Sequence, residues 1–135
     1  MKTQLQVTLM LAAAVYLGWG MSMLLAPSVA HQLLSKGPSD PVTNALFGTA
    51  LIGGVVMFVI AARNPVKEIV RAAASMMALI GLTSAYLLFI PKVIPFSLVT
   101  VVSLVIDLGA AGVLFLTEAR LDLARHQEMK PAVRH

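Results

Sequence analysis

Four long runs of apolar residues, separated by short polar segments, divide the chain from one end to the other. They cover about residues 7–26, 43–62, 72–90 and 96–117. Each run has about the 20 residues that a helix needs to cross a hydrocarbon core roughly 30 Å thick. The runs do not alternate and are about twice as long as the strands of a membrane barrel. The pattern therefore predicts an all-α fold, a single polytopic membrane domain over residues 1–135 that forms an antiparallel bundle of four transmembrane helices.

Prolines and polar residues mark where these helices should end. Pro27, Pro65 and Pro91 follow the first three runs, and the residue before a proline disfavours helix. In the first loop, residues 28–34 predict a short helix with Ser28 as its N-cap, lying in the membrane interface. We expect the polar tail, residues 118–135, to continue the fourth helix as far as Pro131.

The first run also allows a second interpretation, a cleaved signal peptide. It follows Met1-Lys2, and Ser28-Val29-Ala30 has the small residues of a cleavage site. The apolar core of a signal peptide, however, has about 7–15 residues, against about 20 here. The length favours an uncleaved transmembrane helix.

Composition agrees with a membrane protein. Hydrophobic residues make up 59% of the chain and charged residues 12%, against about 45–50% and 25% in soluble domains. The absence of cysteine excludes a disulfide framework, a thiolate metal site and a cysteine nucleophile. The net charge of +4 comes from residues that flank the apolar runs, so we expect no nucleic-acid partner. His31, His126 and His135 lie in segments on opposite sides of the membrane, so we expect no metal site.

The basic residues also predict the topology. Eight of the ten Lys and Arg residues fall in the two termini and the middle loop, and only Lys36 and Lys92 fall in the other two loops. The positive-inside rule then places both termini in the cytoplasm. Five of these residues are expected to set the topology or to contact lipid headgroups: Arg63, Lys67, Arg71, Arg120 and Arg125.

Asp107 is the only ionisable acid or base within a predicted transmembrane helix. A charged Asp at a helix centre costs about 2.5–3.5 kcal/mol to insert, so we expect polar partners around it. Ser103 lies one turn earlier on the same face, Tyr16 lies at the same depth, and Thr83 and Ser84 lie within about a turn of that depth. These positions predict a Tyr16–Asp107 hydrogen bond with Thr83 or Ser84 as a second donor. That contact requires the first and fourth transmembrane helices to be neighbours.

The role of this polar group stays open between structure and chemistry. Asp107 either ties helices together by hydrogen bonds or transfers a proton, contacts a substrate or pairs with a partner's basic residue. Asp107 and Tyr16 are therefore the catalytic candidates, and Trp19 is a candidate border of a quinone or lipid site. Glycines within the runs predict either close helix packing or a face for an oligomer or partner.

The layout resembles a known family at four places. These are Leu24-Leu25-Ala26-Pro27, Phe47-Gly48-Thr49-Ala50-Leu51-Ile52-Gly53-Gly54, Ala61-Ala62-Arg63-Asn64-Pro65 and Arg71-Ala72-Ala73-Ala74. The chain resembles the DoxX-like small bacterial four-helix membrane proteins. The resemblance implies the fold and the membrane location, which we expect to be the bacterial inner membrane. Some relatives are associated with thiosulfate–quinone oxidation, so a quinone is the cofactor it implies, although the family's usual Arg early in the first helix has no counterpart here.

No chemical site is complete in the sequence, so our first functional hypothesis is a non-catalytic subunit or assembly partner of a larger membrane complex. Its expected partners are the lipid bilayer and either other membrane proteins or further copies of the chain, and we expect no cofactor. Two alternatives stay open. One is a quinone-linked redox subunit or enzyme that uses Asp107 for proton transfer, and the other is a small oligomeric transporter.

Overall fold

A computed structural model describes residues 2–128 of the chain, and the side chains of residues 3–120, as five helices without a strand. The helices are α1 (Lys2–Leu25), α2 (Pro27–Leu34), α3 (Pro41–Arg63), α4 (Lys67–Phe89) and α5 (Leu98–Glu128). Of these, α1, α3, α4 and α5 are long and apolar enough to cross a membrane. This confirms the predicted all-α fold and its four transmembrane helices. The chain is a multi-pass membrane protein.

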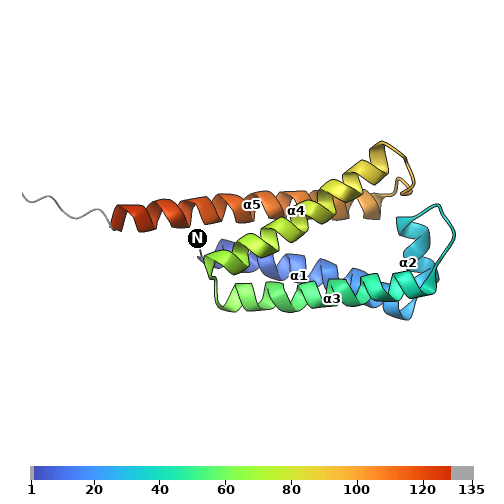
Figure 1. Cartoon of the computed structure of the whole chain (residues 1–135), viewed down its shortest axis with the longest axis horizontal. Helices are drawn as coiled ribbons and strands as arrows, with labels where there is room; N and C mark the ends of the chain where they lie inside the picture. The colour runs from blue at the N-terminus through green and yellow to red at the C-terminus, as the bar shows by residue number, and fades with distance from the viewer. Residues whose placement is uncertain (1, 129–135) are drawn as a thin grey trace, which may run out of the picture.

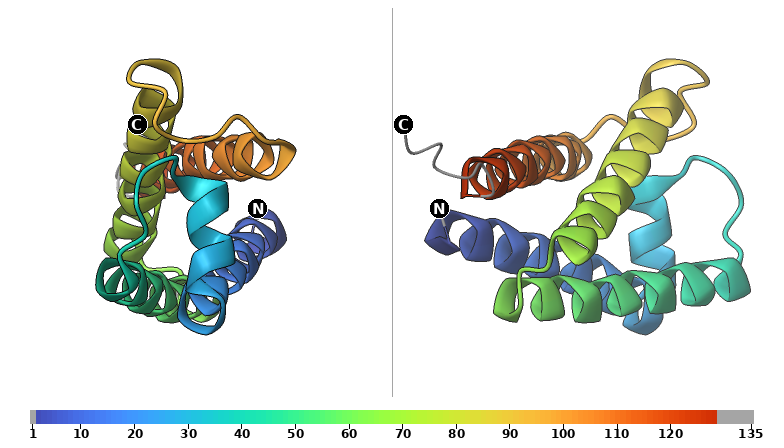
Figure 2. Two further views of the ribbon diagram at one scale, coloured as in Figure 1. Left: turned by 90° about the vertical axis from the view of Figure 1, so that its right-hand side faces the viewer. Right: turned by 60° about the vertical axis from the view of Figure 1, so that its left-hand side comes forward.

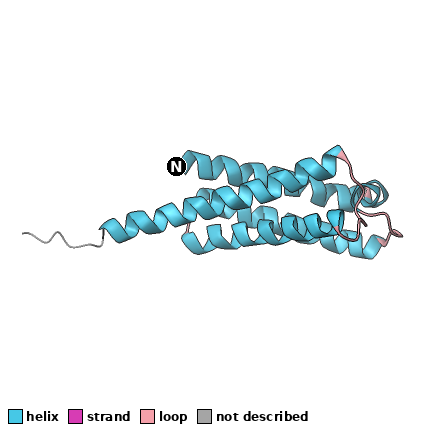
Figure 3. Ribbon diagram, turned by 90° about the horizontal axis from the view of Figure 1, so that it is seen from above, coloured by secondary structure: helices cyan, strands magenta, loops and turns pink. Residues whose placement is uncertain are grey.

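The helices pack as two pairs that share one core. α1 lies along α3, and α4 lies along α5, while α1 also packs on α5 and so joins the pairs. α4 leaves the end of α3 and diverges from it along its length (Figures 1 and 2). Seen from above, most loop residues gather at the end that holds α2, which we call the α2 end (Figure 3). The opposite end holds the N-terminus and the α3–α4 connection, and we call it the terminus end (Figure 1).

Local sequence explains where the helices at the α2 end begin. Asp40 caps α3, because its carboxylate accepts hydrogen bonds from the Val42 N–H at 3.0 Å and from the Thr43 hydroxyl. The Thr43 hydroxyl, and next the Val42 N–H, hold the pKa of Asp40 below its usual 3.8. The prediction that Ser28 caps α2 is wrong. That helix begins at Pro27, whose fixed φ suits the first helical position, and Ala26 stands at the cap without a side-chain bond.

Glycine allows α1 and α3 to meet backbone to backbone near the α2 end. A Cβ atom on Gly20 would lie 2.9 Å from the Gly48 carbonyl oxygen, and a Cβ atom on Gly48 would lie 2.9 Å from the Gly20 carbonyl oxygen. No side chain fits between the helices at this point. The close approach brings α1 and α3 together as one wall of the bundle.

The terminus half of the bundle is filled by apolar side chains. Leu9, Phe58, Met77 and Leu114 have no exposed surface. The ring of Phe58 also meets the ring of Tyr16 edge to face, with centroids 5.0 Å apart. The core therefore continues from the terminus end up to the level of Tyr16.

Candidate functional site

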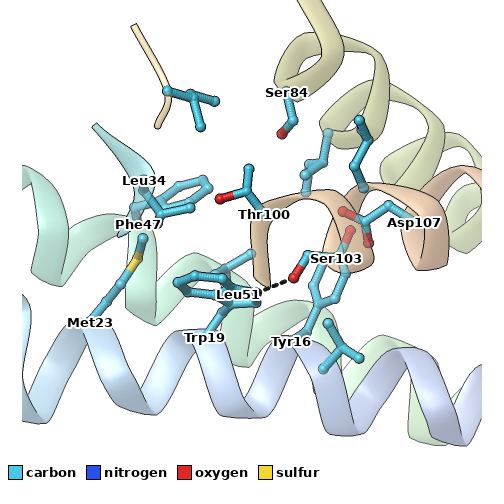
Figure 4. A pocket seen from close by; sticks show the side chains of 14 residues that line it. Tyr16, Trp19, Met23, Leu34, Phe47, Leu51, Ser84, Thr100, Ser103 and Asp107 are labelled. Carbon is cyan, nitrogen blue, oxygen red and sulfur yellow. Dashed lines mark hydrogen bonds between the residues drawn. The ribbon is translucent and has the colours of Figure 1, made fainter. Parts of the chain in front are cut away.

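A cavity of about 80 Å³ lies in the half of the bundle nearer the α2 end, directly beyond this core. Its wall is mostly apolar and comes from all five helices and the α4–α5 connection. Figure 4 shows the polar side chains around it. They are Tyr16, Trp19, Ser84, Thr100, Ser103 and Asp107.

Asp107 and Tyr16 face each other across this cavity. Their side chains point toward one another in Figure 4, and they are close enough to interact electrostatically. Only 7% of Asp107 and 3% of Tyr16 is exposed. Yet among the described residues neither the Tyr16 hydroxyl nor Asp107 Oδ1 has a hydrogen-bond partner. The structure thus brings the two residues together across neighbouring α1 and α5, within reach of the hydrogen bond that we predicted, although their atoms as placed do not have its full geometry.

The remaining residues that we singled out by depth take different places. Ser103 accepts a hydrogen bond of 3.0 Å from the Trp19 indole N–H, which joins α5 to α1 at the cavity wall. Ser84 lines the cavity from α4. Thr83 is exposed and lies outside the cavity, in the groove beside it. Of the six polar or aromatic residues that the sequence pointed to, Thr83 alone lies outside the cavity. The other five line it: Tyr16, Trp19, Ser84, Ser103 and Asp107.

Hydrogen bonds close the cavity at the α2 end. The Thr100 hydroxyl donates to the Leu33 carbonyl oxygen at 3.2 Å and so ties α5 to α2. The Lys36 N–H donates to the Val93 carbonyl oxygen at 2.8 Å and joins the two connections at this end. α2 therefore lies over the cavity and is bonded to α5, and the loop that follows α2 is bonded to the α4–α5 connection.

The cavity adjoins a wider groove between the diverging helices α3 and α4. This groove has a volume of about 470 Å³ and is more open than the cavity. Five residues line both spaces: Leu34, Phe47, Ile80, Ser84 and Ile94. Because α3 and α4 would face lipid here, the groove leads from the cavity sideways into the bilayer.

No comparable route leads from Asp107 to the terminus end. Going from Asp107 along α5 toward that end, the inward-facing residues are Ala110, Ala111 and Leu114, all buried and apolar. They pack in one cluster with the fully buried residues Leu9 and Met77. Asp107 is therefore separated from the terminus end by packed hydrocarbon.

An ion pair that sequence reasoning missed lies at the terminus end. The Glu118 carboxylate pairs with the Arg71 guanidinium, and Glu118 is 5% exposed although it ends the last apolar run. An acid at the end of an apolar run, with basic residues in the neighbouring loop, was the available signal. Arg63 and Arg120 are exposed at this end, and Lys67 is partly buried. Arg125 lies in α5, but its side chain is outside the described residues.

The site does not fit a metal ion or a quinone ring. Among the described residues, no three His, Cys, Asp or Glu side chains gather into a metal-binding group. The cavity of about 80 Å³ is smaller than the roughly 150 Å³ in which a buried benzene ring is held. A quinone ring therefore does not fit it as the helices stand.

Comparison with known proteins adds no family. No family model matches the chain, and neither a curated protein nor a solved structure matches it significantly. The DoxX-like resemblance stays a prediction.

Proposed function

We propose that this protein binds the polar head of a lipid-soluble small molecule in the cavity beside Asp107. One observation carries the proposal: Asp107 Oδ1 and the Tyr16 hydroxyl are both buried, and neither has a hydrogen-bond partner among the described residues. A buried polar group without a partner costs about 1–3 kcal/mol, and more in hydrocarbon. A ligand that hydrogen-bonds to both atoms removes this cost.

The dimensions of the site favour a small head and an apolar tail. A cavity of about 80 Å³ has room for several groups the size of a water molecule, which each need about 10–15 Å³. The groove between α3 and α4 gives a tail a path into the bilayer. Packed hydrocarbon separates Asp107 from the terminus end, so a ligand would enter through the half of the bundle nearer the α2 end.

Native mass spectrometry of the protein, extracted gently from its own membranes, tests the proposal. We expect the wild-type chain to retain a small-molecule adduct and Asp107→Asn to lose it. Thr49→Val is the matched control, because the Thr49 hydroxyl is exposed and donates to Ala45 of its own helix. An adduct of equal occupancy in Asp107→Asn, or no adduct on wild type, would contradict the proposal.

A non-catalytic subunit of a larger complex is the second candidate, and one face of α5 favours it. A Cβ atom on Gly109 or Gly112 would have no atom within 4 Å, and both residues are exposed. Val105 and Leu116 flank them on the same face and are 63% and 64% exposed. Such small residues let another helix approach closely.

The same spectra distinguish the possible partners of this face. A heteromeric mass supports the subunit hypothesis, and a mass of several identical chains supports the oligomer that a four-helix transporter would need. We expect Gly109→Leu to dissociate either complex. Gly53→Leu is the matched control, since the Cβ position of Gly53 is equally open but lies on α3. A monomeric mass for wild type would contradict both hypotheses.

We also propose that the protein lies in a bacterial inner membrane with the terminus end in the cytoplasm. The distribution of the basic residues supports this orientation. The chain has no cysteine, so a single introduced cysteine reports its own position. On intact spheroplasts, a membrane-impermeant maleimide should label Lys36→Cys at once and Arg63→Cys only after permeabilisation. Labelling of Arg63→Cys on intact spheroplasts, with Lys36→Cys labelled only after permeabilisation, would show the opposite topology.

A further inference from the structure

We infer that the ligand of this cavity is a cation, a lipid-soluble primary amine whose ammonium group pairs with Asp107. The inference rests on the proposed function and specifies the chemical class of its ligand. It follows from the charges, the aromatic rings and the size of the cavity.

The first argument is charge. Asp107 is the only ionisable acid among the residues that line the cavity, and no Lys, Arg or His lines it. A buried carboxylate is costly unless an opposite charge lies beside it, and nothing in the cavity wall supplies one. A ligand ammonium supplies that charge, whereas a carboxylate or phosphate would place two negative charges in one apolar cavity.

The second argument is the composition of the wall. Three aromatic side chains line the cavity, Tyr16, Trp19 and Phe47, and aromatic ring faces attract cations. An ammonium group has three N–H donors and needs acceptors for them. Asp107 Oδ1 and the Tyr16 hydroxyl oxygen are free to accept, and the Ser84 hydroxyl lies on the α4 side of the same cavity.

The third argument is size. A primary ammonium is about as large as a methyl group, so it fits a cavity of about 80 Å³ together with the first carbons of its chain. The rest of the chain would lie in the groove between α3 and α4, against apolar side chains such as Leu79 and Leu87. A bulky quaternary ammonium head fits the same cavity less well.

The experiment compares three eight-carbon probes that differ only in the charge of the head: n-octylamine, 1-octanol and octanoate. Trp19 is the only tryptophan in the chain and lines the cavity, so its emission reports binding directly. We would titrate the full chain in phosphatidylcholine nanodiscs at neutral pH, where octylamine is an ammonium ion. We expect a saturable change with octylamine, about tenfold weaker binding of octanol, and no binding of octanoate.

Two variants link this preference to the carboxylate. Asp107→Asn keeps the shape of the side chain and removes its charge, so octylamine should bind it no better than octanol. Thr49→Val should keep the wild-type preference. Far-UV circular dichroism checks that each variant is folded. If a variant is unfolded, the comparison of the three probes on the wild-type protein still tests the inference.

The outcomes separate this inference from the proposed function. Saturable binding of octanol with an affinity equal to or above that of octylamine would overturn the cation inference and leave a ligand site in place. An unchanged preference for octylamine in folded Asp107→Asn would overturn the role of the carboxylate. If no probe gives a saturable change in wild type, both the inference and the proposed function are contradicted.

Discussion

Replacing Gly20 with alanine tests the close contact of α1 and α3 that forms one wall of the bundle. The new Cβ atom would lie 2.8 Å from Ile52 Cγ1 and 2.9 Å from the Gly48 carbonyl oxygen. Favourable contacts between carbon atoms lie at about 3.5–4.0 Å. The Ile52 side chain can rotate away, but the Gly48 oxygen is backbone, so the helices must separate by several tenths of an ångström. Such overpacking costs about 1–3 kcal/mol.

Gly18→Ala is the matched control, because a Cβ atom at Gly18 would have no atom within 4 Å. Both changes gain the preference of helices for alanine over glycine, at most about 1 kcal/mol, so this gain cancels between them. We therefore expect Gly20→Ala to unfold with a free energy about 1–3 kcal/mol below that of Gly18→Ala. The assay is unfolding by sodium dodecyl sulfate in mixed micelles, followed by far-UV circular dichroism.

Equal stability of the two variants would refute the backbone contact between α1 and α3. Gly48→Ala tests it from the other side, since its Cβ atom would lie 2.9 Å from both the Gly20 carbonyl oxygen and Met23 Cβ. It should destabilise the protein with the same sign. If Gly20→Ala lowers the stability and Gly48→Ala does not, the strain comes from the contact with the Ile52 side chain and not from the backbone contact.

Three further predictions concern polar contacts. Ser103→Ala removes the acceptor of the Trp19 indole, and we expect a loss of about 0.6–1.7 kcal/mol in unfolding free energy together with a shifted tryptophan emission. Arg71→Gln leaves the buried Glu118 carboxylate without that cation; the guanidinium is 59% exposed, so we expect a loss of only about 1 kcal/mol in the same assay. The pKa of Asp40 is below 3.8, so its cap stabilises α3 above its unfolded pKa and is lost as the pH falls through the lower folded value; the NMR resonance of the capped amide should report this.

Each of these predictions has a nearby control. Ser22→Ala removes a hydroxyl that donates only to a carbonyl of its own helix, so it should leave the tryptophan emission unchanged. Arg120→Gln removes an exposed cation at the same end as Arg71 and should cost less. Ser39→Ala, beside the cap, should leave the acid transition of the amide in place. If a control variant changed the measured property as much as its test variant did, the contact assigned to the test residue would be contradicted.

The number of transmembrane helices was predictable because the thickness of a bilayer sets the length of an apolar helix. The ends were less predictable. α4 begins at Lys67 rather than near residue 72, because polar residues of the first turn are helical although they lie outside the apolar run. The continuation of the fourth helix into the polar tail, by contrast, was predicted, and α5 is described as a helix to Glu128, while Pro131 lies outside the described residues.

For the candidate site, the sequence predicted only how deep in the membrane each residue lies. Counting residues placed Tyr16 at the level of Asp107, but periodicity does not say which helices are neighbours. The packing of α1 on α5 decides that, and it also pairs Trp19 with Ser103. Thr83 and Ser84 are adjacent in sequence and nearly equal in depth, yet their side chains leave the helix in different directions, so only Ser84 lines the cavity.

Because the α2 end is closed, the site responds to the concentration of ligand in the bilayer and not to its concentration in water. Hydrogen bonds from Thr100 to Leu33 and from Lys36 to Val93 hold α2 and the connections over the cavity, whereas the groove between α3 and α4 leads sideways. A ligand that enters by this groove exchanges with the bilayer rather than with water, so occupancy follows its partition coefficient. Each additional methylene adds about 0.8 kcal/mol to partitioning, roughly a fourfold gain. Lengthening the tail would therefore raise the apparent affinity from water without any new contact to the protein.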